Sequence, residues 1–159
     1  AVRIDMGTPL LNKADVPMQG EGICSLETIA VEGREFLCSA LNTGVPHLVV
    51  FEDGLSEEEV CHYGPLLEKH PLFPAKINVN FARVQPDGSI SVRTWERGCG
   101  RTLACGTGSC ACVVAAAMAG YTQRTATVRL ALGELLIEWA EDGHIFMTGP
   151  AEDSFRGTI

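Results

Sequence analysis

Residues 98–119 read GCGRTLACGTGSCACVVAAAMA, and this stretch decides the fold. Its second half, Ser109–Ala119, holds almost only small and apolar residues, so a helix formed there is apolar on every side and must be buried. Gly120 follows, at the point where a glycine in the left-handed conformation commonly ends a helix. The sequence therefore predicts a buried helix that is entered from a glycine-rich loop.

Strand-like segments lie on both sides of this helix along the chain. A second helix should open at Ser56, because Ser56 and Glu59 have the spacing of a capping box, and Pro65 should break or kink it. We therefore expect an α+β fold of mostly antiparallel strands wrapped around one buried central helix. The expected strands are Val2–Met6, Ile23–Val31, Phe36–Ala40, Leu48–Phe51, Ile77–Val84, Ile90–Trp95, Thr127–Ala131, Glu134–Ala140 and His144–Thr148.

Composition narrows the class of protein. The 159 residues amount to about one domain. The formal net charge of −8 argues against a nucleic-acid partner, which would need a basic face. No apolar run approaches the roughly 20 residues that a membrane-spanning helix needs, so we expect no membrane partner. Seven cysteines, an odd number, do not suit a disulfide framework and indicate a reducing compartment, which we take to be the cytoplasm.

The glycine-rich loop brings Cys105 to the start of the buried helix. Backbone N–H groups at a helix N-terminus bind anions, and the same end favours the thiolate form of a cysteine. Cys105 is therefore a candidate base or nucleophile beside a carboxylate site at Gly106 and Thr107. Glu96 and Arg97 add a hydrogen-bond acceptor and a fork that can hold a carboxylate bidentately.

A purely structural role for the cysteines is the alternative. Most cysteines fill cores, and Cys110 and Cys112 on the helix suit that role. Cys99, Cys105 and the two helix cysteines could in principle hold zinc, but they lack the paired Cys-x-x-Cys spacing, and we assign no metal.

Residues 96–108 closely resemble the second catalytic-cysteine motif of the diaminopimelate epimerase family. Other segments resemble that family in the same order, across nearly the whole chain. Val2–Gly7 is similar to the strand that opens its second domain, and Met147–Ala151 with Phe155 and Gly157 is similar to its closing motif. The remaining matches are Asn42–His47, which resembles a Gly-x-Pro-His motif, and Ile77–Phe81, which resembles an Asn-containing strand.

The resemblance implies a cofactor-independent isomerase, with neither pyridoxal phosphate nor a metal. Enzymes of this family have two domains of related fold, and each domain supplies one cysteine. One cysteine, as thiolate, removes the α-proton of the amino acid, and the other, as thiol, delivers a proton to the opposite face. LL- and meso-diaminopimelate are thereby interconverted in lysine and peptidoglycan-precursor biosynthesis. We accordingly expect a small-molecule amino-acid substrate, and a homodimer, as is frequent in the family.

Carried over by position, Cys105 is the acid/base of the second domain, and Gly106 and Thr107 bind the α-carboxylate through their N–H groups. Such preorganised donors would also stabilise the carbanion. Glu96 and Arg97 hold the substrate, Glu96 at an ammonium group.

Three further residues take expected roles from the same resemblance. Asn78 matches a substrate-binding Asn, and His47 lies where the family has a His near the catalytic cluster, paired with Glu96 in our expectation. Val45 replaces an Asn that contacts substrate in some members, so Asn42 is the expected substitute for that contact.

Residues 1–159 thus resemble a single domain, the C-terminal half of a two-domain epimerase whose N-terminal domain is absent. The start at Ala1 fits that boundary, and none of the other six cysteines sits in the Asn-Cys-Gly-Asn-type loop of the first domain. Inversion needs a second proton donor, so we expect the chain to be inactive alone. A proline or hydroxyproline-type racemase and a non-catalytic binding module of the same fold remain the alternatives.

Overall fold

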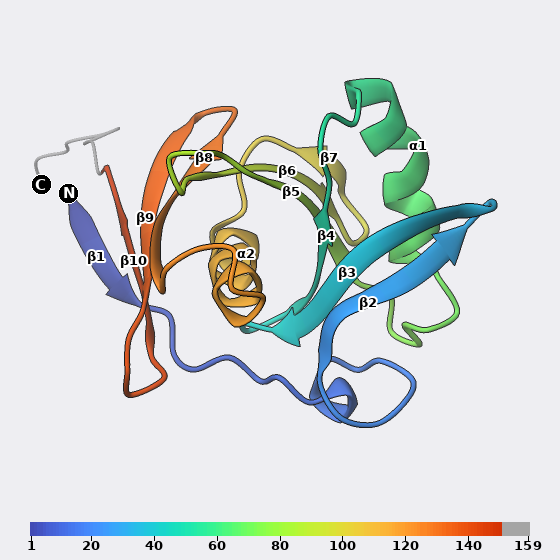
Figure 1. Ribbon diagram of the computed structural model, residues 1–159, viewed down its shortest axis with the longest axis horizontal. Helices are drawn as coiled ribbons and strands as arrows, with labels where there is room; N and C mark the ends of the chain where they lie inside the picture. The colour runs from blue at the N-terminus through green and yellow to red at the C-terminus, as the bar shows by residue number, and fades with distance from the viewer. Residues whose placement is uncertain (151–159) are drawn as a thin grey trace, which may run out of the picture.

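The computed structural model describes residues 1–150, which form one mixed sheet of ten strands with two α-helices (Figure 1). The helices are α1, Glu57–Glu68, and α2, Gly106–Met118, and a short 3-10 turn covers Lys13–Asp15. The strands are β1 Val2–Asp5, β2 Cys24–Val31, β3 Arg34–Asn42, β4 Pro46–Phe51, β5 Asn78–Val84, β6 Ile90–Glu96, β7 Gly100–Thr102, β8 Thr125–Leu130, β9 Gly133–Trp139 and β10 Ile145–Gly149.

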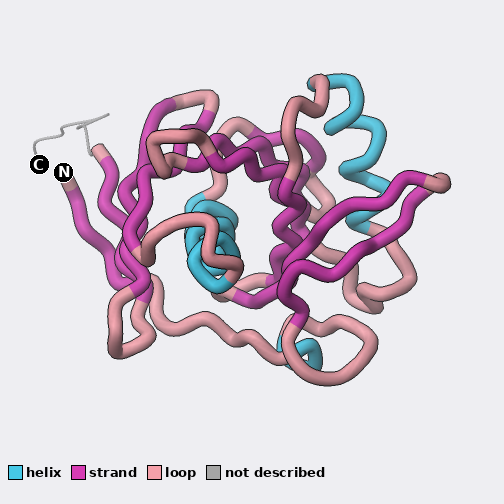
Figure 2. The backbone as a smooth tube through the Cα atoms, in the orientation of Figure 1, coloured by secondary structure: helices cyan, strands magenta, loops and turns pink. Residues whose placement is uncertain are grey.

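The sheet runs in the order β1-β10-β9-β8-β6-β5-β4-β3-β2, and β7 pairs with β6 outside this path. Only the β4–β5 and β6–β8 pairs are parallel, and each is connected through one of the two helices. The other pairings are antiparallel, which agrees with the expected α+β class. In Figure 2, α2 is the helix near the middle of the view, with strands on either side of it.

The apolar core has two parts, one on each face of the central strands. Val60 and Leu67 of α1 belong to one cluster with Leu48 and Val50 of β4. Val49, the β4 residue between them, belongs to the other cluster, which includes the buried residues of α2. Strand β4 is apolar without alternation because both of its faces are covered, as in parallel-sheet strands generally.

Helix α1 begins as its sequence predicts. The Ser56 hydroxyl accepts the Glu59 N–H at 3.1 Å, and the Glu59 carboxylate accepts the Ser56 N–H at 3.0 Å, which completes the capping box. The expected break at Pro65 is wrong, because the helix continues through Pro65 to Glu68. It ends three residues later, so only its last turn has to tolerate the proline.

Two further departures from the expected elements surround the candidate site. Helix α2 starts at Gly106 and not at Ser109, because Cys105 caps it and the Ser109 N–H already bonds to the Cys105 carbonyl at 2.9 Å. Strand β7 was not expected, and it forms where the glycine-rich loop folds back on β6, with Glu96 opposite Gly100.

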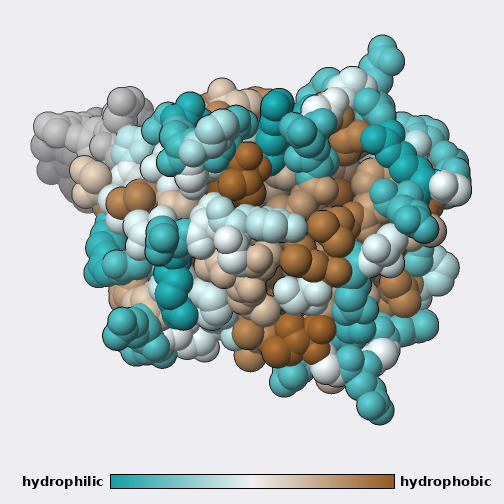
Figure 3. Space-filling model, viewed as in Figure 1, coloured by the Kyte–Doolittle hydropathy of each residue, from teal (hydrophilic) through white to brown (hydrophobic). Residues whose placement is uncertain are grey.

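Surface polarity is uneven. On the face shown in Figure 3, apolar atoms gather toward the middle and polar atoms lie mainly round the rim. No helix among residues 1–150 is long and apolar enough to cross a membrane.

Candidate active site

Cys105 lies at the N-terminus of α2, as the sequence predicts. It is the N-cap residue with an extended backbone (φ −147°, ψ 110°), and its half-buried Sγ accepts the Gly108 N–H at 3.3 Å. The N–H groups of Gly106 and Thr107 belong to the first turn, where a helix supplies no acceptor of its own. The sulfur therefore sits beside backbone donors that suit a carboxylate or a developing negative charge.

Thr107 connects Cys105 to the interior. Its Oγ1 lies 3.6 Å from the Cys105 sulfur and 2.8 Å from Nε2 of His47. The Thr43 hydroxyl donates to the Thr107 carbonyl at 2.8 Å, which ties the loop before β4 to the first turn of α2. His47 thus reaches the Cys105 sulfur through Thr107.

His47 is completely buried, and it bonds to a second buried polar side chain behind it. Asn80 Nδ2 lies 3.0 Å from His47 Nδ1 and 3.1 Å from the Leu48 carbonyl, and Asn80 Oδ1 accepts the Thr94 hydroxyl at 3.1 Å. Burial and, to a smaller extent, the nearby Arg97 lower the pKa of His47 to about 3. The imidazole is therefore neutral near pH 7 and acts as a hydrogen-bonding group.

The expected pairing of His47 with Glu96 is not formed in the described residues. Both imidazole nitrogens are engaged elsewhere, and Glu96 Oε1 accepts the Thr102 hydroxyl at 3.1 Å. Strand β7, which carries Thr102, is the element that holds the Glu96 carboxylate.

The loop that carries Arg97 is anchored from two sides. The Arg97 N–H donates to Asn78 Oδ1 at 2.8 Å, and Nδ2 of the same Asn78 donates to the Pro46 carbonyl at 2.8 Å. The buried Glu68 carboxylate accepts the Gly98 N–H at 3.1 Å and the Trp95 indole N–H at 3.0 Å. The loop conformation is therefore fixed by α1 and β5 before any ligand arrives.

Asn42 is engaged with backbone groups. Its Nδ2 donates to the Asp15 carbonyl at 3.1 Å, and its Oδ1 accepts the Gly44 N–H at 2.9 Å. This side chain shapes the turn before β4, and its expected contact with substrate stays a prediction.

The remaining cysteines divide by burial. Cys110 and Cys112 are buried in α2, and burial raises the pKa of Cys110 to about 12, with a smaller contribution from the neighbouring Cys105. Cys99 is exposed. Within residues 1–150, no three His, Cys, Asp or Glu side chains are grouped as metal ligands. Phe155 and Gly157 of the expected closing motif lie outside the described residues, as does Ala151.

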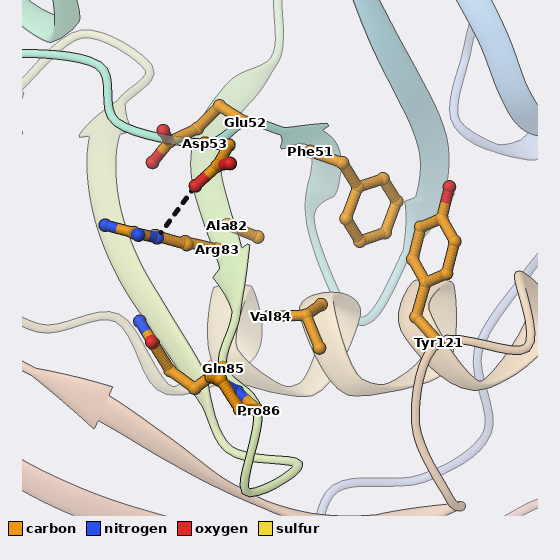
Figure 4. A pocket seen from close by; sticks show the side chains of 9 residues that line it. All are labelled: Phe51, Glu52, Asp53, Ala82, Arg83, Val84, Gln85, Pro86 and Tyr121. Atoms are coloured by element: carbon orange, nitrogen blue, oxygen red, sulfur yellow. Dashed lines mark ion pairs between the residues drawn. The ribbon is translucent and has the colours of Figure 1, made fainter.

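A groove of about 640 Å³ lies elsewhere, between the ends of β4 and β5 (Figure 4). Phe51 and Tyr121 meet edge to face there with ring centroids 5.1 Å apart, and Arg83 pairs with Asp53 at 3.1 Å. None of the residues expected at the site lines this groove, so it is separate from the Cys105 cluster.

Sequence reasoning missed Asn80, Thr94 and Glu68. Asn80 could have been found, because Asn78 and Asn80 are two positions apart, with Val79 between them, and therefore share one face of the strand. Thr94 lies directly opposite Asn80 in the β5–β6 register, which only the strand pairing reveals.

In sequence, the chain is similar to one family of enzymes. The family model "Diaminopimelate epimerase" matches residues 39–153. The diaminopimelate epimerase of Desulfitobacterium hafniense is 46% identical over 99% of this chain and 56% of its own length. That of Desulforudis audaxviator is 49% identical over 98% of this chain and 57% of its own length. The chain thus spans little more than half the length of these curated relatives.

Two solved structures have a similar fold. A hydroxyproline epimerase from Agrobacterium vitis, with bound trans-4-hydroxy-L-proline, matches with a TM-score of 0.66 at 17% identity, over 91% of this chain and 48% of that one. A probable proline racemase from Agrobacterium radiobacter matches with a TM-score of 0.59 at 17% identity, over 96% of this chain and 54% of that one. At this identity, the likeness concerns the fold alone.

Proposed function

The chain belongs to the diaminopimelate epimerase family, and on that premise we propose that it supplies one half of a two-cysteine epimerase site for diaminopimelate. The observation that carries the proposal is the position of Cys105, whose half-buried sulfur caps α2 and accepts the Gly108 N–H. The 41% to 49% identity to diaminopimelate epimerases favours this substrate over proline or hydroxyproline.

In the proposed reaction, the Cys105 thiolate takes the α-proton of one epimer and becomes a thiol. The electron pair left on the α-carbon spreads into the α-carboxylate, which the N–H groups of Gly106 and Thr107 stabilise. A second thiol on the opposite face then donates its proton to the α-carbon and becomes a thiolate. In the reverse direction, Cys105 is the thiol that donates.

The remaining expected residues would hold the substrate. We propose that Arg97 binds a carboxylate and Glu96 an ammonium group, since Arg97 lies on the loop anchored by Asn78 and Glu68, and Glu96 lies directly before it at the end of β6. Asn78 has one further Nδ2 hydrogen for a ligand beyond its bond to Pro46. We assign His47 an indirect role through Thr107, because it is fully buried and reaches that hydroxyl at 2.8 Å.

We propose that the second thiol belongs to a further domain, since the chain spans 56% of the Desulfitobacterium hafniense enzyme. We also propose the family arrangement in which the sheet wraps α2. Contacts of α2 with β3, β4, β5, β6, β8, β9 and β10 support that arrangement. The seven free cysteines support a cytoplasmic location, because disulfides rarely persist there.

A chimera tests the function directly. This chain would replace the matching segment of the Desulfitobacterium hafniense enzyme, and solvent deuterium incorporation at the α-carbon would be followed by NMR with LL-diaminopimelate. We expect epimerisation with deuteration by the chimera and neither by the isolated chain. Loss of the thiol in Cys105→Ser should reduce the chimera's rate by at least about 100-fold, the usual scale of acid–base catalysis.

Cys110→Ser is the matched control, because Cys110 is a buried cysteine on the same helix. This substitution should leave the chimera active. Full activity of the Cys105→Ser chimera would contradict the role of Cys105. Rapid epimerisation by the isolated chain would contradict the need for a second half.

A further inference from the structure

Asn80 lies at the inner end of a hydrogen-bonded series that leads outward to Cys105. Three neighbouring strands each contribute one buried polar side chain: His47 from β4, Asn80 from β5 and Thr94 from β6. All three are at most 2% exposed. Burying such polar groups in an apolar core destabilises the fold unless each of them has a hydrogen-bond partner.

The donor and acceptor roles in this series are fixed by a backbone carbonyl. The Leu48 carbonyl can only accept, so the amide group facing it at 3.1 Å must be Asn80 Nδ2. The same Nδ2 faces His47 Nδ1 at 3.0 Å, so Nδ1 is the acceptor. Since the buried imidazole is neutral, its single proton must then lie on Nε2.

This tautomer also fixes the direction of the Thr107 hydroxyl. His47 Nε2 donates its proton to Thr107 Oγ1 across 2.8 Å, so the Thr107 hydrogen has to point elsewhere. Among the described residues, the other hydrogen-bond partner of Thr107 Oγ1 is the Cys105 sulfur, at 3.6 Å. The sulfur thus faces two donors, the Thr107 O–H and the Gly108 N–H.

We propose that Asn80 is a positioning residue for Cys105, because it locks His47 in the Nε2–H tautomer and thereby makes the Thr107 hydroxyl a donor toward the sulfur. The inference rests on the proposed role of Cys105 as an acid/base. Two donors stabilise a thiolate more than a thiol, because a hydrogen bond to an ionised acceptor is the stronger one. With the opposite tautomer, Thr107 would donate to His47 and present a lone pair to the thiol.

The packing around Asn80 fits this role. A Cβ atom on Gly108 would lie 2.3 Å from Asn80 Oδ1 and 3.2 Å from the Cys105 sulfur. The helix approaches Asn80 this closely only because residue 108 is a glycine. Asn80 Oδ1 is also held by the Thr94 hydroxyl, so the amide has a single satisfied orientation.

Imidazole nitrogen NMR on the wild-type chain tests the tautomer without any substitution. We expect the His47 proton on Nε2 and a non-protonated Nδ1. A proton on Nδ1 would overturn the proposal.

Alkylation kinetics test the consequence. The parent would be Cys61→Ser/Cys99→Ser, so that Cys105 is the accessible thiol, and iodoacetamide rates would be measured from pH 6 to pH 10. In Asn80→Asp, a carboxylate oxygen faces His47 Nδ1 and can only accept, so the imidazole proton moves to Nδ1. His47 Nε2 then accepts from the Thr107 hydroxyl, and the direction of the hydrogen bonds is reversed. We expect the rate near neutral pH to fall roughly tenfold, the effect of one hydrogen bond to a charged group, with an unchanged plateau at high pH.

Thr107→Val should give the same fall, and Thr107→Ser should retain the parent rate. Asn80→Asp should then have no further effect in the Thr107→Val background, which is the coupling that a double-mutant cycle detects. A folded Asn80→Asp variant at the parent rate, or equal effects in both backgrounds, would overturn the proposal. Alkylation does not depend on turnover. An inactive chimera would therefore count against the proposed function, and an alkylation rate unaffected by Asn80→Asp would count against the positioning role of Asn80.

Discussion

At the scale of single residues, His47 shows how burial sets the protonation state of a group. Its ordinary pKa of 6.5 falls to about 3 in the folded chain, first because of burial and then because of Arg97. Between these two pH values the unfolded chain binds a proton that the folded chain excludes. Stability contributed by His47 is therefore complete above pH 6.5 and declines as the pH falls toward 3.

We predict that the free energy of unfolding drops on acidification from pH 6.5, by up to about 1.4 kcal/mol per pH unit from this residue. Exposed His144 acts oppositely, since its hydrogen bond to Asp5 raises its pKa and stabilises the fold at low pH. The lowered pKa values of Glu57 and Glu59 matter only below their ordinary 4.5. Urea unfolding between pH 4.5 and 7 measures the slope.

His47→Gln should flatten this slope while lowering stability overall, because it removes the titrating group. His144→Gln is the matched control on the surface. A wild-type stability that does not change across this window would contradict the buried neutral state of His47.

At the scale of elements, α2 is placed by close contact with the polar side chains of the sheet. Alanine normally stabilises a helix relative to glycine, by about 1 kcal/mol. At Gly108 the added methyl would meet Asn80 Oδ1, which is held by Thr94, so the neighbour cannot give way. We predict that Gly108→Ala destabilises the fold by about 1–3 kcal/mol, measured by urea unfolding.

Gly106→Ala is the matched substitution in the same turn. Its nearest neighbours are the Met147 Sδ and Cε atoms at 3.2 and 3.3 Å, at the end of a flexible side chain. We expect little loss of stability there. A Gly108→Ala chain that is more stable than the parent would show that α2 can move away from Asn80.

At the scale of the whole molecule, the seven thiols report on the fold. Cys24, Cys38, Cys110 and Cys112 are buried, and burial raises the pKa of Cys24 to about 12. We predict that iodoacetamide labels only Cys61, Cys99 and Cys105 in the native chain at pH 7, with Cys105 the fastest. Mass spectrometry of peptides after timed quenching measures each site.

In urea concentrated enough to unfold the chain, all seven thiols should label at similar rates. Rapid native labelling of Cys112 would contradict the burial of α2. Equal native rates at Cys61 and Cys105 would contradict the donor environment of the Cys105 sulfur.

Much of this architecture could be predicted from the sequence, because local signals agreed with the fold. The apolar run after Ser109 and the capping box at Ser56 both act through neighbouring residues. Two features could not be predicted, the capping of α2 by Cys105 and the pairing of β7 with β6. Both depend on the conformation of the glycine-rich loop.

The candidate site also has a part that the local sequence predicts and a part that depends on the pairing of distant segments. Cys105, Glu96 and Arg97 stand in one continuous motif, so the sequence alone suggests their grouping, which stays a prediction. The link from Asn80 through His47 to Thr107 joins β5, β4 and α2, and no sequence spacing encodes it. The incorrect His47–Glu96 pair arose because both were assigned to one cluster without the register that separates them.

The pairing of β1 with β10 has a consequence for the order of events during synthesis. Val2 lies opposite Gly149, so β1 leaves the ribosome before the other nine strands of the sheet, and its partner β10 follows only after all the others. Even in the folded chain β1 is an edge strand on which Val2 and Ile4 stay exposed, so it should dock late and detach first. Pulsed hydrogen exchange during refolding would place its amides in the slowest phase.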